Sequence, residues 1–105
     1  MAIVGHLING QIVNDGDRNQ DIYNPSTGEV SKQVALASRT TVAQAICAAQ
    51  DAYPAWRNTP AIKRARIMFK FKDLLEQHAE EICSLMGAEH GKMSHDAAGA
   101  LQRGI

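Results

Sequence analysis

Short apolar runs separated by turn residues occupy the first third of the chain, which predicts strands. Two such runs, 6–8 and 11–13, flank Asn9-Gly10, and an Asn-Gly pair in this setting is a strong hairpin signal because both turn positions need a positive φ. After a polar loop, another extended run stops at Asn24-Pro25, since proline keeps the preceding residue out of helical geometry. Alternation over 30–37 predicts a half-buried strand. The residues on its expected buried face are Val30, Lys32, Val34 and Leu36.

Apolar residues recur at helical spacing through the rest of the chain. Ser38 is expected to be the N-cap of the first helix, and Pro54 is expected either to end that helix or to bend it near its last turn. Thr59-Pro60 predicts the start of a second helix, with Thr59 as its cap and the proline at the first helical position. One helix from 60 to 90 would be long for a globular protein, so we expect a break near Gln77-His78.

One more helical pattern closes the chain. Gly91 suits a helix C-cap, because glycine takes the left-handed conformation without steric cost. Ser94 is expected to cap a last helix whose apolar face is still running at Ile105, and this unfinished face favours a truncated chain. We therefore predict one α+β segment, in which an N-terminal hairpin, strands and turns over 1–37 precede about three helices over 38–105.

Charge and composition narrow the class of protein. The 105 residues include 11 basic and 11 acidic side chains, and this balance argues against a surface for nucleic acid or for an anionic membrane. One local basic cluster lies on a predicted amphipathic helix, where a solvated face is expected; it consists of Lys63, Arg64, Arg66, Lys70 and Lys72. No apolar run reaches the ~20 residues of a membrane span, and no secretory signal is evident, so we expect a cytoplasmic location.

Few residues suggest chemistry by themselves. Cys47 and Cys83 lie inside predicted helices, away from the helix starts that lower a thiol pKa, so we expect both to pack as small hydrophobes. His90 and His95 are five positions apart rather than four, so no metal site is predicted. The remaining candidates are Glu80, Glu81 and Glu89, which are expected to face solvent. Composition and spacing alone therefore support only a soluble α+β domain.

Short motifs spread over nearly all of residues 1–105 are similar to those of a known protein family. They are Leu7-Ile8-Asn9-Gly10, Asn24-Pro25-Ser26-Thr27-Gly28-Glu29-Val30, Ala52-Tyr53-Pro54-Ala55-Trp56, Arg64-Ala65-Arg66-Ile67-Met68-Phe69-Lys70-Phe71, Glu89-His90-Gly91-Lys92 and Gln102-Arg103-Gly104-Ile105. In this order and spacing the chain resembles the start of the aldehyde dehydrogenase superfamily, and most of all the methylmalonate-semialdehyde dehydrogenases. Two departures are Thr41, where the family commonly has Glu, and Gly87 inside a helix.

The resemblance implies an NAD-dependent, CoA-acylating oxidation of a semialdehyde. A cysteine thiolate attacks the aldehyde, hydride passes to NAD, and CoA takes the acyl group; in the methylmalonate type CO2 is also lost, which gives propionyl-CoA or acetyl-CoA. The family's nucleophile, active-site glutamate and dinucleotide loops lie downstream, and Cys47 and Cys83 do not match the nucleophile. The resemblance therefore implies no catalytic, cofactor or metal residue in this segment, which is expected to be inactive alone.

Arg103 is the one residue that can be carried over. It matches the arginine that holds the substrate carboxylate in this subfamily, and a guanidinium can bind a carboxylate through two parallel hydrogen bonds. The alternative is an ordinary exposed helix arginine, which sequence alone would favour.

Three hypotheses follow. The first is an N-terminal dehydrogenase segment whose strands pack beside the dinucleotide domain and whose helices cover it. Its expected partners are the rest of the chain and further copies of itself, by helix swapping for example. The second is a stand-alone helical interaction or oligomerisation module derived from the enzyme. The third, an independent small enzyme, is disfavoured because no nucleophile–base constellation is visible.

Overall fold

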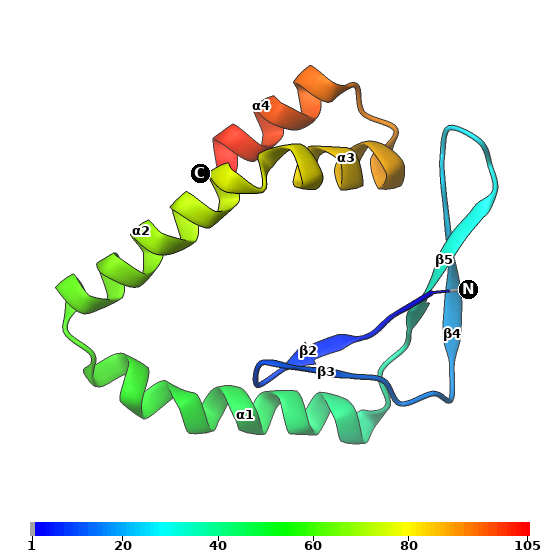
Figure 1. Ribbon diagram of the computed structural model, residues 1–105. Coiled ribbons are helices and arrows are strands. Elements are labelled where there is room, and N and C mark those ends of the chain that lie inside the picture. Colours follow the sequence, from blue (N-terminus) through cyan, green and yellow to red (C-terminus); the bar gives the residue numbers. More distant parts are fainter. Residues whose placement is uncertain (1) are drawn as a thin grey trace. The chain divides into compact units, whose positions relative to one another are not determined.

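The computed structural model describes residues 2–105, in which strands precede helices (Figure 1). The strands are β1 (Ile3–Val4), β2 (His6–Ile8), β3 (Gln11–Val13), β4 (Asn19–Tyr23) and β5 (Val30–Ala35). The helices are α1 (Arg39–Asn58), α2 (Ala61–Gln77), α3 (Ala79–His90) and α4 (Ser94–Gly104). This arrangement confirms the predicted α+β class. The described helices number four rather than about three, because the expected break at His78 separates α2 from α3.

The chain forms two compact units. The first extends up to Tyr23 and includes Val30–Thr59, so it holds the strands and α1. The second combines the turn Asn24–Glu29 with Pro60–Ile105, which contains α2, α3 and α4. Within residues 2–105, no helix combines the length and apolarity that crossing a bilayer requires.

The predicted hairpin is present in the first unit. β2 and β3 pair antiparallel, with His6 opposite Val13 and Ile8 opposite Gln11. Asn9 and Gly10 both have positive φ values, 50° and 76°, as a tight turn between twisted strands requires. β2 contacts α1, so the hairpin covers part of that helix.

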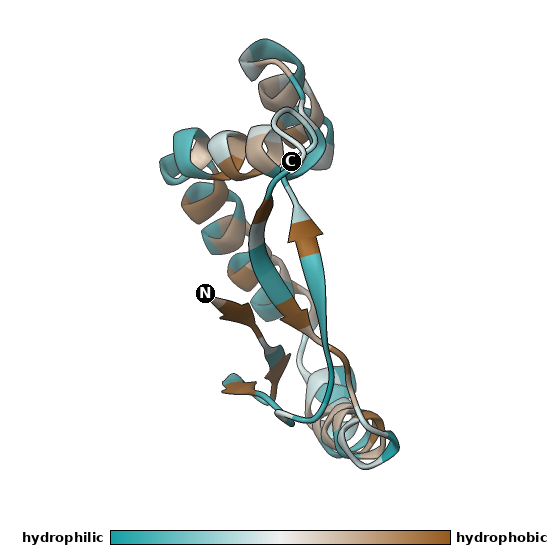
Figure 2. Ribbon diagram, turned by 90° about the vertical axis from the view of Figure 1, so that its right-hand side faces the viewer, coloured by the Kyte–Doolittle hydropathy of each residue, from teal (hydrophilic) through white to brown (hydrophobic). Residues whose placement is uncertain are grey.

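The other strands form a sheet in the order β1-β5-β4, with β1 parallel and β4 antiparallel to β5. Figure 2 shows long hydrophilic stretches along the strands of this sheet, with hydrophobic positions toward their ends. The most buried residue of β5 is Ala35, at 3% exposure, which lies on the face opposite to the predicted one. The strand is half-buried, as predicted, although its single most buried residue lies on the other face. The four residues of the predicted face, Val30, Lys32, Val34 and Leu36, are only partly buried.

Asp15 ties the loop after β3 to the start of α1. Ser38 is the N-cap, as predicted, and its hydroxyl accepts the Thr41 N–H at 3.1 Å. The Asp15 carboxylate accepts the Ser38 N–H and the Thr41 hydroxyl, each at 2.6 Å. These hydrogen bonds, that of Thr41 first, lower the pKa of Asp15 below its ordinary value. Thr41, the family departure, is 6% exposed and so replaces a capping box with a hydroxyl–carboxylate link.

The junction between α1 and α2 differs from the prediction. α1 continues past Pro54 to Asn58, so the proline does not end the helix. The Thr59 hydroxyl donates to the Ala55 carbonyl at 2.8 Å, which places Thr59 at the end of α1. The prediction that Thr59 caps α2 was therefore wrong, and Pro60 occupies that N-cap position.

In the second unit, α3 ends at Gly91 and contacts α4. Gly91 has a left-handed φ of 76° and its N–H donates to the Gly87 carbonyl at 2.9 Å, which confirms the predicted C-cap. A Cβ on Gly91 would lie 3.4 Å from Pro25 Cγ, so the Asn-Pro turn packs against the end of α3. Ser94 is the first residue of α4 rather than its cap, because Met93 takes the N-cap position.

Asp15→Asn is expected to weaken the dependence of stability on pH. The pKa of Asp15 is lowered in the fold, so its contribution is full above the unfolded value of about 3.9 and is lost as the pH falls through the lower folded value. The melting temperature, followed by the helical signal from pH 7 to about 2.5, should therefore fall less steeply with decreasing pH in the variant than in the parent chain. Asp17 is an exposed neighbour, and Asp17→Asn is the control. Its melting temperature should depend on pH as steeply as that of the parent chain. Equal slopes in all three chains would contradict the assignment.

Gly91→Ala should lower the free energy of unfolding by about 1–2 kcal/mol, because a left-handed φ is costly for any residue with a Cβ. The contact with Pro25 leaves little room for relaxation. Gly87→Ala is the matched control, since Gly87 lies inside α3 and its Cβ would meet only the Lys92 carbonyl at 3.5 Å. That substitution should be neutral or stabilising by up to about 1 kcal/mol. Urea unfolding measures both, and similar losses in the two variants would refute the prediction.

Candidate functional site

Arg103 lies in the last turn of α4 and is exposed. A cation in this position interacts favourably with the partial negative charge at a helix C-terminus. Within the described part of the chain, no carboxylate forms an ion pair with Arg103 and no acceptor is hydrogen-bonded to it. A guanidinium carries five N–H donors in a planar fork, and the geometry of that fork matches a carboxylate.

Gly99 lies one turn before Arg103 on the same face of α4. A Cβ on Gly99 would lie 3.4 Å from Nη1 of Arg103. The arginine side chain thus extends toward the helix N-terminus, as long side chains on helices do, and its guanidinium lies over the glycine. The sequence analysis did not identify Gly99, because the sequence does not show which atoms lie beside a glycine in a helix.

Asp96 completes this face of the helix, one turn before Gly99. Its carboxylate lies 3.5 Å from Nε2 of His95, and both side chains are well exposed. The acidic group is in the first turn of α4, where it complements the helix dipole. The face is thus acidic at its start and basic at its end, with a side-chain-free position between them.

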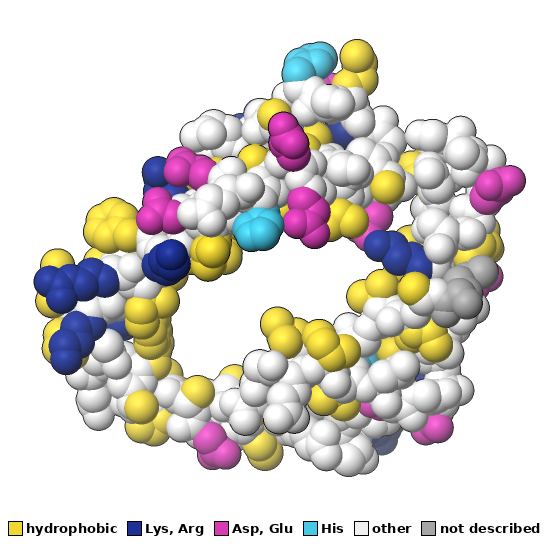
Figure 3. All heavy atoms as spheres, in the orientation of Figure 1, with side chains coloured by type: hydrophobic (Ala, Val, Ile, Leu, Met, Phe, Trp, Pro, Cys, Tyr) yellow, Lys and Arg dark blue, Asp and Glu magenta, His cyan; other side chains and the backbone are white. Residues whose placement is uncertain are grey.

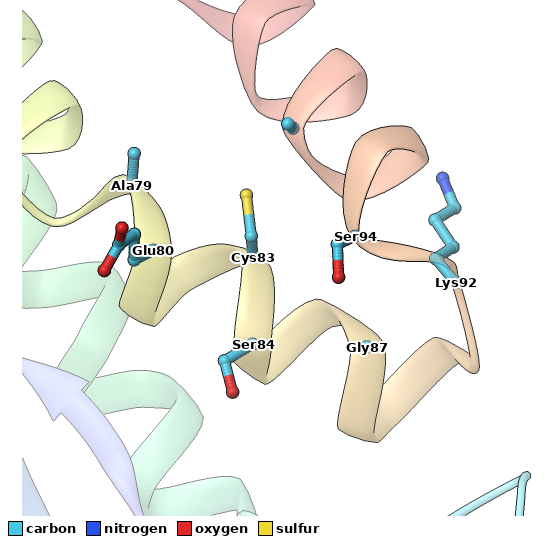
Figure 4. A pocket seen from close by; sticks show the side chains of 8 residues that line it. Ala79, Glu80, Cys83, Ser84, Gly87, Lys92 and Ser94 are labelled. Carbon is cyan, nitrogen blue, oxygen red and sulfur yellow. The ribbon is translucent and has the colours of Figure 1, made fainter.

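Cys83 lines an open pocket of about 540 Å³ between α3 and α4 (Figure 4). Its thiol rises from the middle of α3 on the side of α4, and Lys92 and Ser94 lie on the connection and the start of α4. Cys83 is half-buried and has no hydrogen-bonding base among residues 2–105. A nucleophilic thiol is activated by such a base or by a helix N-terminus, whereas Cys83 lies in the middle of α3.

Cys47 is exposed on α1, so the prediction that it packs as a buried hydrophobe was wrong for this structure. It lies on the side of α1 away from Ala45, Ala48 and Ala49, the small residues over which the hairpin packs. The helical pattern could not reveal this, because Cys47 lies in an apolar run, between Ile46 and Ala48.

A groove in the first unit runs between β2 and α1 and has a volume of about 540 Å³. It is mostly apolar, and Ile8, Val42 and Ile46 contribute to its walls. His6 also lines it, and its buried Nε2 has no hydrogen-bond partner within the described chain. A mainly apolar groove of this kind suits a packing segment better than a polar substrate.

α2 exposes apolar side chains on two opposite faces. Figure 3 shows hydrophobic side chains beside Lys and Arg side chains over this helix. One face carries Ile67, Phe71 and Leu74, between 40% and 53% exposed, and the other carries Ile62 and Phe69, at 60% and 65%. A helix with apolar residues on both sides is normally covered on both sides.

Lysines and arginines surround these apolar faces of α2. Lys63, Arg66, Lys70 and Lys72 are exposed, as expected for a solvated face, and Arg64 is partly buried. Lys72 pairs with Glu76 at 2.9 Å, an exposed contact between successive helix turns. Such surface pairs contribute little to stability, so this cluster is no specific site.

The predicted acidic residues also face water. Glu80, Glu81 and Glu89 are exposed, and the Glu81 carboxylate lies 3.2 Å from Nδ1 of His78. Across residues 2–105, no three side chains of the metal-binding types gather in one place.

Comparison with known proteins identifies the family to which the chain belongs. The model of the aldehyde dehydrogenase family matches residues 12–105. The chain is 52% identical over 105 residues to the malonate-semialdehyde dehydrogenase of Pseudomonas aeruginosa, covering 100% of this chain and 21% of the relative. Malonate-semialdehyde dehydrogenase 1 of Geobacillus kaustophilus is 41% identical, with 99% of this chain and 22% of the relative covered.

Solved structures agree with these sequence matches. A methylmalonate-semialdehyde dehydrogenase from Oceanimonas doudoroffii superposes with a TM-score of 0.97 at 64% identity, over 99% of this chain and 21% of that chain. A Sinorhizobium meliloti 1021 protein, assigned as a methylmalonate-semialdehyde dehydrogenase and solved with NAD, gives 0.95 at 41% identity, again over 99% and 21%. The chain therefore spans about a fifth of the length of the relatives it matches.

Proposed function

Since the chain belongs to the aldehyde dehydrogenase family, we propose that it is the N-terminal part of an NAD-dependent, CoA-acylating malonate- or methylmalonate-semialdehyde dehydrogenase. The observation that carries the proposal is the superposition on the Oceanimonas doudoroffii enzyme, with a TM-score of 0.97 at 64% identity over 99% of this chain. The relative from Sinorhizobium meliloti 1021, which was solved with NAD, supports the choice of cofactor.

The segment supplies substrate binding rather than chemistry in this proposal. A malonate-type semialdehyde has a carboxylate at one end and an aldehyde at the other, so a cation that holds the first fixes the position of the second. Arg103 takes this role through two parallel hydrogen bonds to the carboxylate. In the full-length enzyme NAD accepts the hydride and CoA the acyl group, and both bind outside this segment. The enzyme acts in the cytoplasm, and the segment alone is inactive.

The segment's partner is the rest of the dehydrogenase chain. The chain exposes 8136 Å². Two separate compact bodies of half its mass would together expose only about 7,000 Å². The groove between β2 and α1 and the faces of α2 belong to the apolar part of this surface. Covering them is the structural contribution of the missing four-fifths, and further copies of the chain are the substitute when that part is absent.

A stand-alone interaction or oligomerisation module is the alternative function. The same exposed apolar groove and helix faces favour it, because large apolar patches mark sites of protein association. In that case the occupant of these surfaces would be another protein or a second copy, and Arg103 would have no substrate.

Arg103→Ala in the full-length enzyme should raise KM for the semialdehyde by about 10- to 150-fold, since hydrogen bonds to a charged group contribute about 1.5–3 kcal/mol. An aldehyde of similar size without a carboxylate should lose little. Steady-state kinetics with both substrates measure the difference. Equal losses for the two aldehydes would remove Arg103 from the substrate site.

The isolated 105-residue chain should be helical and should elute as an oligomer of its 11.4 kDa subunit, because its apolar faces associate in water. Size-exclusion chromatography with light scattering tests this, and a clean monomer would contradict it. Adding the remaining four-fifths of the enzyme as a separate chain distinguishes the two functions. Conversion of the oligomer into an active complex supports the hypothesis of a dehydrogenase segment. A defined oligomer that does not bind the added chain supports the hypothesis of a stand-alone module.

A further inference from the structure

One face of α2 combines an open apolar stripe with positive charge. Ile67, Phe71 and Leu74 follow one another at helical spacing and are 53%, 51% and 40% exposed. Together with Arg66 and Lys70 they line an open hollow of about 400 Å³. A helix face that leaves three large apolar side chains in water is normally covered by another segment.

Three cations border this stripe and have no partner in their own chain. Lys63, Arg66 and Lys70 are exposed, and within the described residues none of them forms an ion pair. At 3.6 residues per turn all three lie along the same flank of the stripe. Lys72, on the opposite side of α2, differs from them because it pairs with Glu76 at 2.9 Å. The three cations and the stripe together form the cationic face of α2.

The flanking charge restricts what can cover the stripe. A row of surface cations alone is solvated and contributes little. A segment that packs on the stripe, however, also lies against the three cations. Carboxylates along the edge of such a segment are attracted to them, whereas further Lys or Arg side chains are repelled. The matching occupant is therefore an amphipathic segment with Asp or Glu beside its apolar residues.

We propose that the cationic face of α2 is the docking surface for an acidic amphipathic segment in the downstream part of the same dehydrogenase chain. The inference rests on the proposed function, which makes these residues about a fifth of a longer polypeptide. A segment of the same polypeptide has a high effective concentration, so it binds in preference to a free protein of equal chemistry. A membrane is a poorer match, because the hollow is concave and the 11 basic residues are balanced by 11 acidic ones.

Zero-length cross-linking of the full-length enzyme with a carbodiimide tests the proposal, because the reagent joins an ammonium to a carboxylate only where the two are in contact. Lys63 and Lys70 should each be joined to Asp or Glu residues of the downstream chain. Lys72 should be joined to Glu76, which makes this pair the internal control. Enzyme assembled from isotope-labelled and unlabelled subunits shows whether each link lies within one subunit. Links from Lys63 and Lys70 only to another subunit, or none while the Lys72–Glu76 link forms, would overturn the inference.

Charge reversal at Lys70 is the second test. Lys70→Glu should lower the melting temperature of the full-length enzyme by about 2–4 °C more than Lys70→Gln does, because Glu repels the acidic partner whereas Gln only loses the attraction. The excess should shrink in about 1 M salt, which screens charges beyond about 3 Å. The same two substitutions at Lys72 are the matched control and should differ by less than about 1 °C, since they change one exposed pair. Equal differences at the two positions would contradict the proposal.

A membrane as the occupant is tested directly. The full-length enzyme should not sediment with phosphatidylserine vesicles at physiological ionic strength. Sedimentation that Lys70→Glu abolishes would assign the face to an anionic bilayer and overturn the inference.

The cross-links do not depend on catalysis, so they separate this inference from the function on which it rests. If the full-length enzyme oxidises the semialdehyde with NAD and CoA but lacks the links, the docking surface falls and the proposed function stands. If the links form and the enzyme does not use the semialdehyde, the docking surface stands and the proposed reaction falls.

Discussion

A helix that is apolar on one side gains most of its stability when that side is removed from water. Among the described residues this condition is hardly met, because only two apolar residues, Ala35 and Ala97, are fully buried. Each unit forms its hydrogen-bonded elements and local caps, yet leaves the outer faces of those elements open. The space between the hairpin and α1 is lined by alanines of that helix together with the larger Val42 and Ile46, and it stays open.

Features set by neighbouring residues were predictable from the sequence. The turn at Asn9-Gly10 and the caps at Ser38 and Gly91 depend on backbone conformations that those residues favour locally, and the structure has all three. The break at His78 followed from helix length. Sequence reasoning failed where two local roles competed, as at Thr59, whose hydroxyl serves the helix before it rather than the one after it.

Long-range partners were beyond the sequence. Asp15 contacts residues 23 and 26 positions away, and nothing in its own neighbourhood indicates this. β1 is two residues long, too short for a strand period, and its parallel pairing with β5 depends on the fold. Arg103 became a candidate through a family resemblance, whereas the position of its guanidinium beside Gly99 is visible only in the structure. Placement of atoms across one helix turn thus added what residue types alone did not.

The turn Asn24–Glu29 belongs to the second unit, although the strands on either side of it belong to the first. The polypeptide therefore passes from the first unit to the second, back again and out once more. Neither unit can be excised as one continuous stretch, and a single cut in the backbone cannot release one from the other. A protein engineer who wished to exchange one unit between relatives would need three junctions rather than one fusion point.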